Sequence, residues 1–217
     1  RDKRVRPHLD DKVLTAWNGL MIAAFARAAR VRAGSPAAPR YLAAARRAAE
    51  FIRRALWKPD VRLLRRYRDG EAAINGYAED YAFLIFGLLE LFQADGDAQW
   101  LEWAQTLQAQ QNALFWDPIE GGWFSTTGRD ESVLLRLKED YDGAEPAASS
   151  IGVLNLLVLA HLSPEPKTQS PQAKAQSLEP KDQIDLTLGS FASRAAQSGR
   201  IVPMMLAALS TYHAGMP

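Results

Sequence analysis

The chain has 217 residues, of which 47% are hydrophobic and 24% are charged, and it contains six Trp and eight Phe. This composition supplies a sizeable core and excludes a wholly disordered chain. Cysteine is absent, which excludes disulfides, thiolate zinc sites and cysteine nucleophiles within the chain. No apolar run approaches the roughly 20 residues of a membrane span, so we expect no membrane partner and a cytoplasmic location.

The formal charge of +1 conceals two polarised stretches. Residues 27–68 carry 13 basic and two acidic residues, whereas residues 69–145 carry 16 acidic and three basic residues. Aromatic residues do not alternate regularly with the basic ones in the manner of nucleic-acid-binding proteins. We therefore interpret the basic stretch as a solvated outer wall, expect no nucleic-acid partner, and place the mouth of any site in the acidic stretch.

The apolar spacing is helical nearly throughout. Asp10 or Asp11 offers an N-cap for the first helix, and a short stretch, Arg62–Arg68, ends at a turn dipeptide. Residues 121–128 read as a loop or hairpin, and the proline-rich residues 163–182 as a flexible insertion. The predicted helices span roughly residues 14–28, 41–57, 77–93, 98–115, 147–162, 183–196 and 203–212.

These helices alternate in character along the chain. The third and fifth are apolar nearly all round and the first and seventh lean the same way, whereas the second, fourth and sixth each have one polar face. Alternation of this kind suits two concentric rings of helical hairpins, an all-α toroid, although an ordinary bundle or an α-solenoid also buries alternate helices. A six-hairpin toroid needs about twelve helices, so residues 1–217 would form part of one, an interior piece of a longer gene product.

Three polar clusters lie at the N-terminal ends of the apolar helices. If the inner helices run the same way, the clusters meet at one mouth. Carboxylates and aromatic rings together are typical of sugar recognition, because rings stack on pyranose faces and carboxylates bind hydroxyls or transfer protons. The clusters contain His8, Asp10, Asp11, Lys12, Trp17 and Asn18; Asn75, Tyr77, Glu79, Asp80 and Tyr81; and Lys138, Glu139, Asp140, Tyr141, Asp142 and Glu145.

Simpler roles compete with these assignments. Asp10, Asp11, Asp142 and Glu145 are each placed to cap a helix, and Trp17 fits a core position. Glu79 and Asp80 are harder to explain, because adjacent carboxylates entering an apolar helix point to different sides, and burying one without a partner is costly.

The histidines are scattered. His161 lies in the apolar fifth helix, where we expect a core histidine, and only His8 is placed to act as an acid or base at the mouth.

The motifs in these clusters resemble the thioredoxin-domain-containing family of spermatogenesis-associated protein 20 and its bacterial YyaL-like relatives. The resemblance rests on residues 10–21 (DDKVLTAWNGLM), 77–82 (YAEDYA), 121–126 (GGWFST) and 138–150 (KEDYDGAEPAASS). It implies a thioredoxin-like domain followed by an (α/α)6 toroid of the six-hairpin glycosidase type, of which this chain would be the second half. The thioredoxin-like domain and the first half of the toroid would then be partners that this sequence lacks.

The combined prediction is a glycosidase- or epimerase-like domain for a neutral carbohydrate, with no metal and no cofactor. Asp80 and Asp142 are the predicted catalytic carboxylates, and the predicted substrate-binding residues are Asp11, Trp17, Asn18, Glu79, Tyr81 and Tyr141. The alternative is a non-catalytic toroid that serves as a scaffold or ligand-binding module for the thioredoxin-like domain. A half toroid also exposes a flank of buried-type helices, which predicts self-association or packing against the missing half.

Overall fold

The computed structural model describes residues 4–5, 9–58, 62–129, 133–162 and 178–215. Within them the fold is mostly helical, with one small antiparallel sheet. The helices are α1 (Thr15–Val31), α2 (Ala38–Ala55), α3 (Ala78–Asp95), α4 (Ala98–Phe115), α5 (Ala148–Leu162), α7 (Pro180–Ser198) and α8 (Pro203–Ala214), with a short 3-10 turn, η1 (Gly199–Ile201), before α8. The strands are β1 (Val13–Leu14), β2 (Trp57–Lys58), β3 (Arg62–Arg68) and β4 (Glu71–Asn75).

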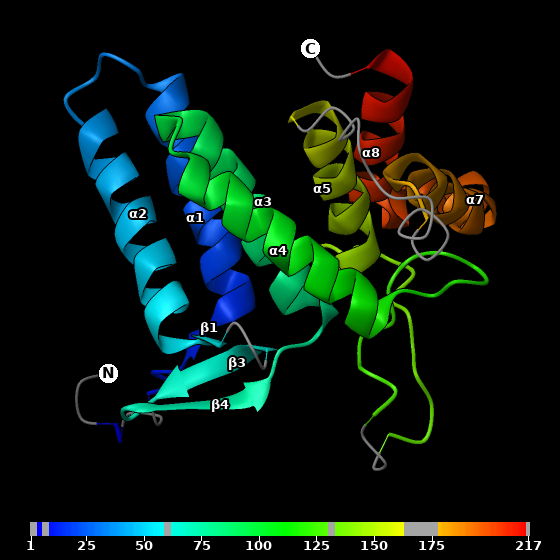
Figure 1. Cartoon of the computed structure of the whole chain (residues 1–217), viewed down its shortest axis with the longest axis horizontal. Helices are drawn as coiled ribbons and strands as arrows, with labels where there is room; N and C mark the ends of the chain where they lie inside the picture. Colours follow the sequence, from blue (N-terminus) through cyan, green and yellow to red (C-terminus); the bar gives the residue numbers. More distant parts are fainter. Residues whose placement is uncertain (1–3, 6–8, 59–61, 130–132, 163–177, 216–217) are drawn as a thin grey trace, which may run out of the picture.

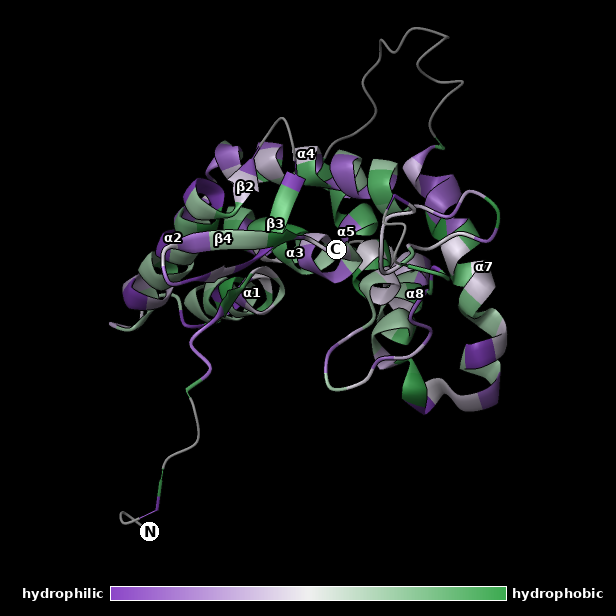
Figure 2. Cartoon of the chain, turned by 90° about the horizontal axis from the view of Figure 1, so that it is seen from below, coloured by the Kyte–Doolittle hydropathy of each residue, from purple (hydrophilic) through white to green (hydrophobic). Residues whose placement is uncertain are grey.

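The helices form two layers that curve into an open arc (Figures 1 and 2). Along the inner layer α1 packs on α3, α3 on α5 and α5 on α8. The outer helices α2, α4 and α7 each pack behind an inner helix, on α1, α3 and α5 respectively. The predicted alternation is confirmed for α3 and α5, which are mostly buried, and for α2, which buries only Ala45, Ala49 and Ile52. It is not confirmed for α8, which buries only Met205 and Ala208.

The closest approach in the inner layer is the packing of α1 against α3. A Cβ on Gly19 would stand 2.5 Å from the backbone of Phe83, and a Cβ on Gly87 would stand 2.5 Å from the carbonyl oxygen of Gly19. Only glycine fits at both positions, so the two backbones touch. This contact holds α1 against α3, and a hydrogen bond from the Ala16 amide to Asp80 places the N-terminal ends of both helices at the same rim of the arc.

The basic stretch before the turn at Asp69-Gly70 forms a strand that the sequence did not assign. Both turn residues have positive φ, 52° and 81°, as a tight hairpin turn requires. β3 pairs with β4 across that turn, and also with β1 and β2, in an antiparallel arrangement. Buried Leu63 and Leu64 hold this sheet against the helices at the end where α1 and α3 begin.

Two predicted boundaries need correction. Asp10 and Asp11 do not cap α1, because Val13 and Leu14 pair with β3 and the helix starts only at Thr15. The helix predicted from residue 183 begins at Pro180, inside the stretch predicted as a flexible insertion, since proline is well suited to the first turn. Residues 163–177 of that predicted insertion lie outside the described residues.

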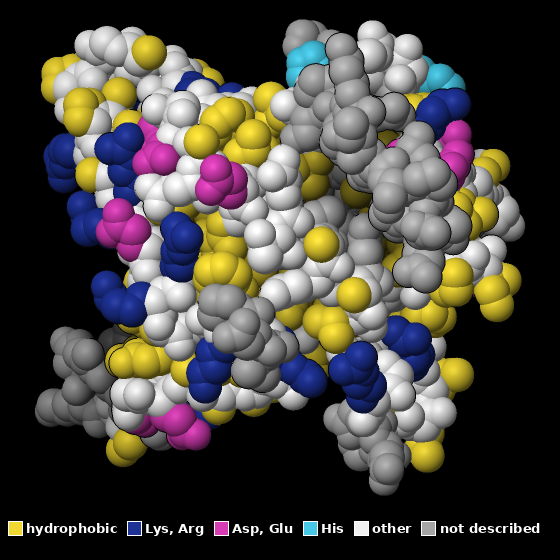
Figure 3. All heavy atoms as spheres, viewed as in Figure 1, with side chains coloured by type: hydrophobic (Ala, Val, Ile, Leu, Met, Phe, Trp, Pro, Cys, Tyr) yellow, Lys and Arg dark blue, Asp and Glu magenta, His cyan; other side chains and the backbone are white. Residues whose placement is uncertain are grey.

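The two oppositely charged stretches pair with one another across the helices. Glu90 on α3 is 5% exposed and forms ion pairs with Arg27 and Arg30 of α1, and Asp95 binds Arg46 of α2. Figure 3 shows acidic side chains beside the basic ones on the side where α2 lies. The basic stretch is therefore only in part a solvated wall, because several of its arginines join inner and outer helices to α3.

In the part of the chain that the structure describes, no helix has the length and apolar character that crossing a membrane requires.

Candidate functional site

Asp80 joins the N-terminal ends of α1 and α3. Its side chain is fully buried. One carboxylate oxygen accepts from the backbone N–H of Ala16 (3.1 Å), and the other accepts from the N–H of Tyr77 (2.9 Å) and from Arg65 (2.8 Å). Burial raises the pKa of Asp80 to about 6, against the opposing effects of Arg65 and the Tyr77 amide.

Asp142 does the same for α5 and α8. One of its oxygens accepts from the N–H of Ala147, the residue before α5 (2.9 Å), and the other from the N–H of Met204 in the first turn of α8 (2.7 Å). A carboxylate at a helix N-terminus satisfies orphan amides and interacts favourably with the helix dipole. The capping role considered for Asp142 from the sequence is therefore present, and it serves two helices.

The N-terminal ends of the four inner helices consequently meet in pairs, each pair tied by one aspartate. The polar clusters are joined across the pairs as well, because the indole N–H of Trp17 on α1 donates to Glu145 in the loop before α5 (3.1 Å). Residues from the first and third clusters thus border one cleft at the rim.

The cleft has a volume of about 490 Å³ and combines exposed aromatic rings with carboxylates. Trp17 is 61% exposed and Tyr141 is 56% exposed, so the core position considered for Trp17 is wrong. The lining residues are Trp17, Leu20, Glu139, Tyr141, Gly143, Ala144 and Glu145.

Glu139 is the carboxyl group at the cleft best suited to hold a proton. Its side chain is exposed, yet the protein still displaces part of its water. This partial desolvation, followed by repulsion from Glu79 and Glu145, raises the pKa of Glu139. Glu79 in turn is held by Arg65 (2.7 Å), whose guanidinium lies over the ring of Tyr77. An acid with a raised pKa beside further carboxylates is an arrangement that can transfer protons.

Four other predicted or clustered residues point elsewhere. Asp11 pairs with Arg68 of β3 (2.8 Å), and the Asn18 amide donates to the Leu14 carbonyl (2.8 Å). Tyr81 is fully buried, and its hydroxyl accepts from the N–H of Leu63 (3.0 Å). Asp140 forms an ion pair with Arg194.

The outcome for the predicted set is mixed. Trp17 and Tyr141 line the cleft, and Glu79 lies near enough to Glu139 to affect its pKa. The catalytic roles given to Asp80 and Asp142 stay predictions, although the structure gives every oxygen of both a hydrogen-bond donor. His8 lies outside the described residues, and His161 is exposed at the end of α5, so it is not a core histidine.

Glu139 and Glu145 were not among the site residues predicted from the sequence. Both stood in the third cluster, but Glu145 precedes Pro146 and a helix and so resembled a cap. The only signal for Glu139 was its place in that cluster, because a loop has no periodicity from which the direction of a side chain can be read. In the described ranges no group of His, Asp and Glu is arranged to hold a metal ion.

Structural comparison identifies the fold. The chain superposes on cellobiose 2-epimerase from Spirochaeta thermophila with a TM-score of 0.61 at 18% identity, covering 88% of this chain and 45% of that one. It superposes on an unsaturated glucuronyl hydrolase from Bacillus with a TM-score of 0.54 at 18% identity, covering 87% and 49%. An α-1,6-mannanase from Salegentibacter gives 0.58 at 14% identity, covering 82% and 46%. The fold is thus that of an (α/α)6 toroid, and the match covers about half of each of these chains.

Sequence comparison gives the relatives, although no family model matches the chain. Mouse spermatogenesis-associated protein 20 is 40% identical over 169 residues, which is 73% of this chain and 21% of that protein. The human protein is 41% identical over 171 residues, and an uncharacterised Caenorhabditis elegans protein is 38% identical over 168. The chain spans about a fifth of the length of these relatives and is a homologue of spermatogenesis-associated protein 20 over that shared stretch.

Proposed function

We propose that this chain contributes a carbohydrate site at the mouth of a six-hairpin toroid within a larger protein. The observation that carries the proposal is the cleft itself, where the exposed rings of Trp17 and Tyr141 stand beside Glu139 and Glu145. Aromatic faces offer an apolar surface to pyranose C–H groups, and carboxylates accept from sugar hydroxyls. An acidic rim favours neutral sugars over phosphorylated or carboxylated ones.

For a catalytic version of this site we assign the roles to the cleft glutamates. Glu139, whose pKa is raised, would donate the proton, and Glu145, held by the Trp17 indole, would accept one. Asp80 and Asp142, predicted from the sequence to be catalytic, would act as positioning residues, because they fix the four inner helices whose ends form the rim.

A non-catalytic ligand-binding toroid is the second candidate. It is favoured by a specific observation: both carboxylates predicted to be catalytic already accept hydrogen bonds from backbone amides at helix starts. The exposed side of the arc would then serve as a binding surface for a neutral sugar without turnover.

Two experiments, one on sugar binding and one on turnover, distinguish the two candidate functions. Titration of the chain with glucose, cellobiose and α-1,6-mannotriose, followed by NMR of the Trp indole N–H groups, tests binding. We expect Trp17→Ala to weaken it about tenfold. The matched control is Trp100→Phe, whose buried ring lies away from the cleft. If none of the three sugars shifts the Trp17 resonance, both candidates are overturned.

Turnover is tested in the full-length homologous protein. We expect Glu139→Gln to lower kcat about 100-fold or more while sugar binding persists, because the amide cannot donate the same proton. Sugar binding without detectable turnover in the unmodified protein would support the non-catalytic module.

A further inference from the structure

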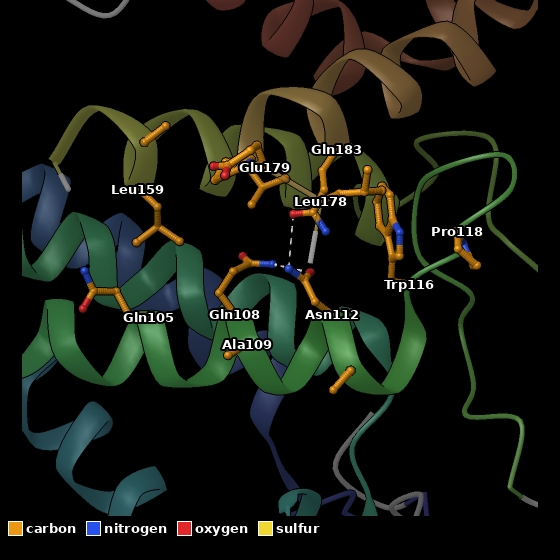
Figure 4. Close-up of a pocket in the computed structure, with 14 residues that line it drawn as sticks. Gln105, Gln108, Ala109, Asn112, Trp116, Pro118, Leu159, Leu178, Glu179 and Gln183 are labelled. Carbon is orange, nitrogen blue, oxygen red and sulfur yellow. Dashed lines mark hydrogen bonds between the residues drawn. The ribbon is translucent and has the colours of Figure 1, made fainter. Parts of the chain in front are cut away.

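A second cavity lies between α4, α5 and the start of α7, and it shares no lining residue with the cleft at the mouth. Its volume of about 740 Å³ is within the usual range for small-molecule sites. Figure 4 shows α4 on one side, with Leu159 of α5 and Leu178, which precedes α7, facing it. The apolar lining residues are Ala109, Ala113, Trp116, Pro118, Leu156, Leu159, Ala160, Leu178 and Pro180.

A chain of side-chain amides forms much of the polar part of this cavity, which Gln105 and Glu179 also line. The Gln108 amide nitrogen donates to Asn112 (3.0 Å) and to Gln111 (3.2 Å), and the Asn112 amide nitrogen donates to Gln183 of α7 (3.3 Å). Gln108 is 6% exposed, and its carbonyl oxygen is buried without a hydrogen-bond partner. In Figure 4 this oxygen points away from Asn112, toward the space between α4 and the start of α7.

The direction of the Gln108 amide is fixed by its neighbours. The oxygen of Asn112 accepts from the indole N–H of Trp123 (3.0 Å), which is a donor only. The amide nitrogen of Gln111 donates to the Ala78 carbonyl (3.2 Å), which leaves the Gln111 oxygen as an acceptor. Gln108 must therefore present its nitrogen to both oxygens, and its own oxygen is left facing the cavity.

An unpaired buried acceptor costs stability unless a donor reaches it. We propose that this cavity binds a small apolar molecule carrying one N–H or O–H donor, which pairs with the Gln108 oxygen while its apolar body packs on the leucines of α5 and on Leu178. The site does not depend on the carbohydrate proposal, because its residues come from α4 and the residues just after it, α5 and the region around the start of α7, whereas the cleft is lined by α1 and the loop before α5.

The test uses indole and N-methylindole, which share an aromatic body but differ in the donor. Ligand titration of the full chain, followed by amide and indole NMR resonances, should show indole binding about 3- to 10-fold more tightly than N-methylindole, the factor expected for one neutral hydrogen bond. The shifts should map to α4 and α5 and leave the Trp17 resonance unchanged. Equal affinity for the two probes, or no binding of either, overturns the proposal.

Three substitutions on α4 test the location of the site and the role of Gln108. Ala109→Trp fills the cavity without replacing a member of the amide chain and should abolish indole binding, whereas Thr106→Trp on α4, which does not line the cavity, should leave it unchanged. Gln108→Leu should remove the preference for indole over its methylated form. Retained indole binding in Ala109→Trp would place the probe elsewhere and contradict the proposal.

Discussion

In each half of the arc one aspartate joins the starts of two helices, but the surroundings of the two aspartates differ. In the first half Asp80 ties α1 to α3, and in the second half Asp142 ties α5 to α8, each through backbone amides at helix starts. Asp80 is fully buried and paired with Arg65, whereas Asp142 is half-buried. The first junction is therefore part of the core, and the second lies closer to solvent beside Tyr141 of the cleft.

Of the substitutions that test this comparison, removal of the buried aspartate should lower the free energy of unfolding most. Asp80→Ala leaves the Ala16 and Tyr77 amides and part of the Arg65 charge without a partner, so we expect a loss of about 3–5 kcal/mol in the free energy of unfolding. Urea unfolding followed by circular dichroism measures it. A loss below about 1 kcal/mol would mean that Asp80 contributes no more stability than an exposed helix cap does.

The same group should make stability depend on pH. Its folded pKa of about 6 lies above the ordinary value of 3.8, so the native state binds the proton more tightly than the unfolded chain. The contribution of Asp80 to the free energy of unfolding should be greatest below about pH 4 and fall as the pH rises to about 6, by up to about 3 kcal/mol. Asp80→Asn should lack this component. If the free energy of unfolding depends on pH in the same way in Asp80→Asn and in the unmodified protein, this prediction is wrong.

The contact between the α1 and α3 backbones provides the next test. Gly87→Ala places a Cβ 2.5 Å from the Gly19 carbonyl oxygen, so the helices must separate, at a cost of about 2 kcal/mol. Gly189→Ala on α7 is the control, because a Cβ there meets nothing within 4 Å and should stabilise the helix by about 0.5–1 kcal/mol. Thermal unfolding of both variants should shift in opposite directions.

Removing the second aspartate should cost less than removing the first. Asp142→Ala leaves two helix-start amides that solvent can partly satisfy, so we expect a loss of about 1–2 kcal/mol. Hydrogen exchange of the Ala147 and Met204 amides would localise the change to this junction. A loss equal to that of Asp80→Ala would remove the distinction between the two halves.

Much of the fold could be predicted because burial imposes a period on the sequence. α3 and α5 are covered on nearly all sides and are apolar throughout, and the outer helices show one polar face. The small sheet was missed because its strands are short and β3 is rich in arginine; only the Asp69-Gly70 turn indicated a hairpin. The first residue of a helix can depend on partners that are distant in the sequence. The start of α1, for example, is set by the pairing of Val13 and Leu14 with β3.

The site was harder to predict than the fold because the partner of a carboxylate is invisible in the sequence. Asp80 is an acid that enters an apolar helix, and Glu90 on the same helix is also buried and is held by two arginines of α1. Both acids are explained by arginines brought to them by the fold. The cleft glutamates are in a loop, where only the folded chain shows that Glu145 faces Trp17.

The smallest effect on stability is expected at the cleft, and it separates a binding residue from the capping ones. Trp17 is 61% exposed and contributes one hydrogen bond, to Glu145, so Trp17→Ala should change the free energy of unfolding by no more than about 0.5 kcal/mol. If the same substitution weakens sugar binding about tenfold, Trp17 acts on the ligand and not on the fold. A loss of stability comparable to that of Asp142→Ala would show instead that the Trp17–Glu145 contact joins the two halves of the arc.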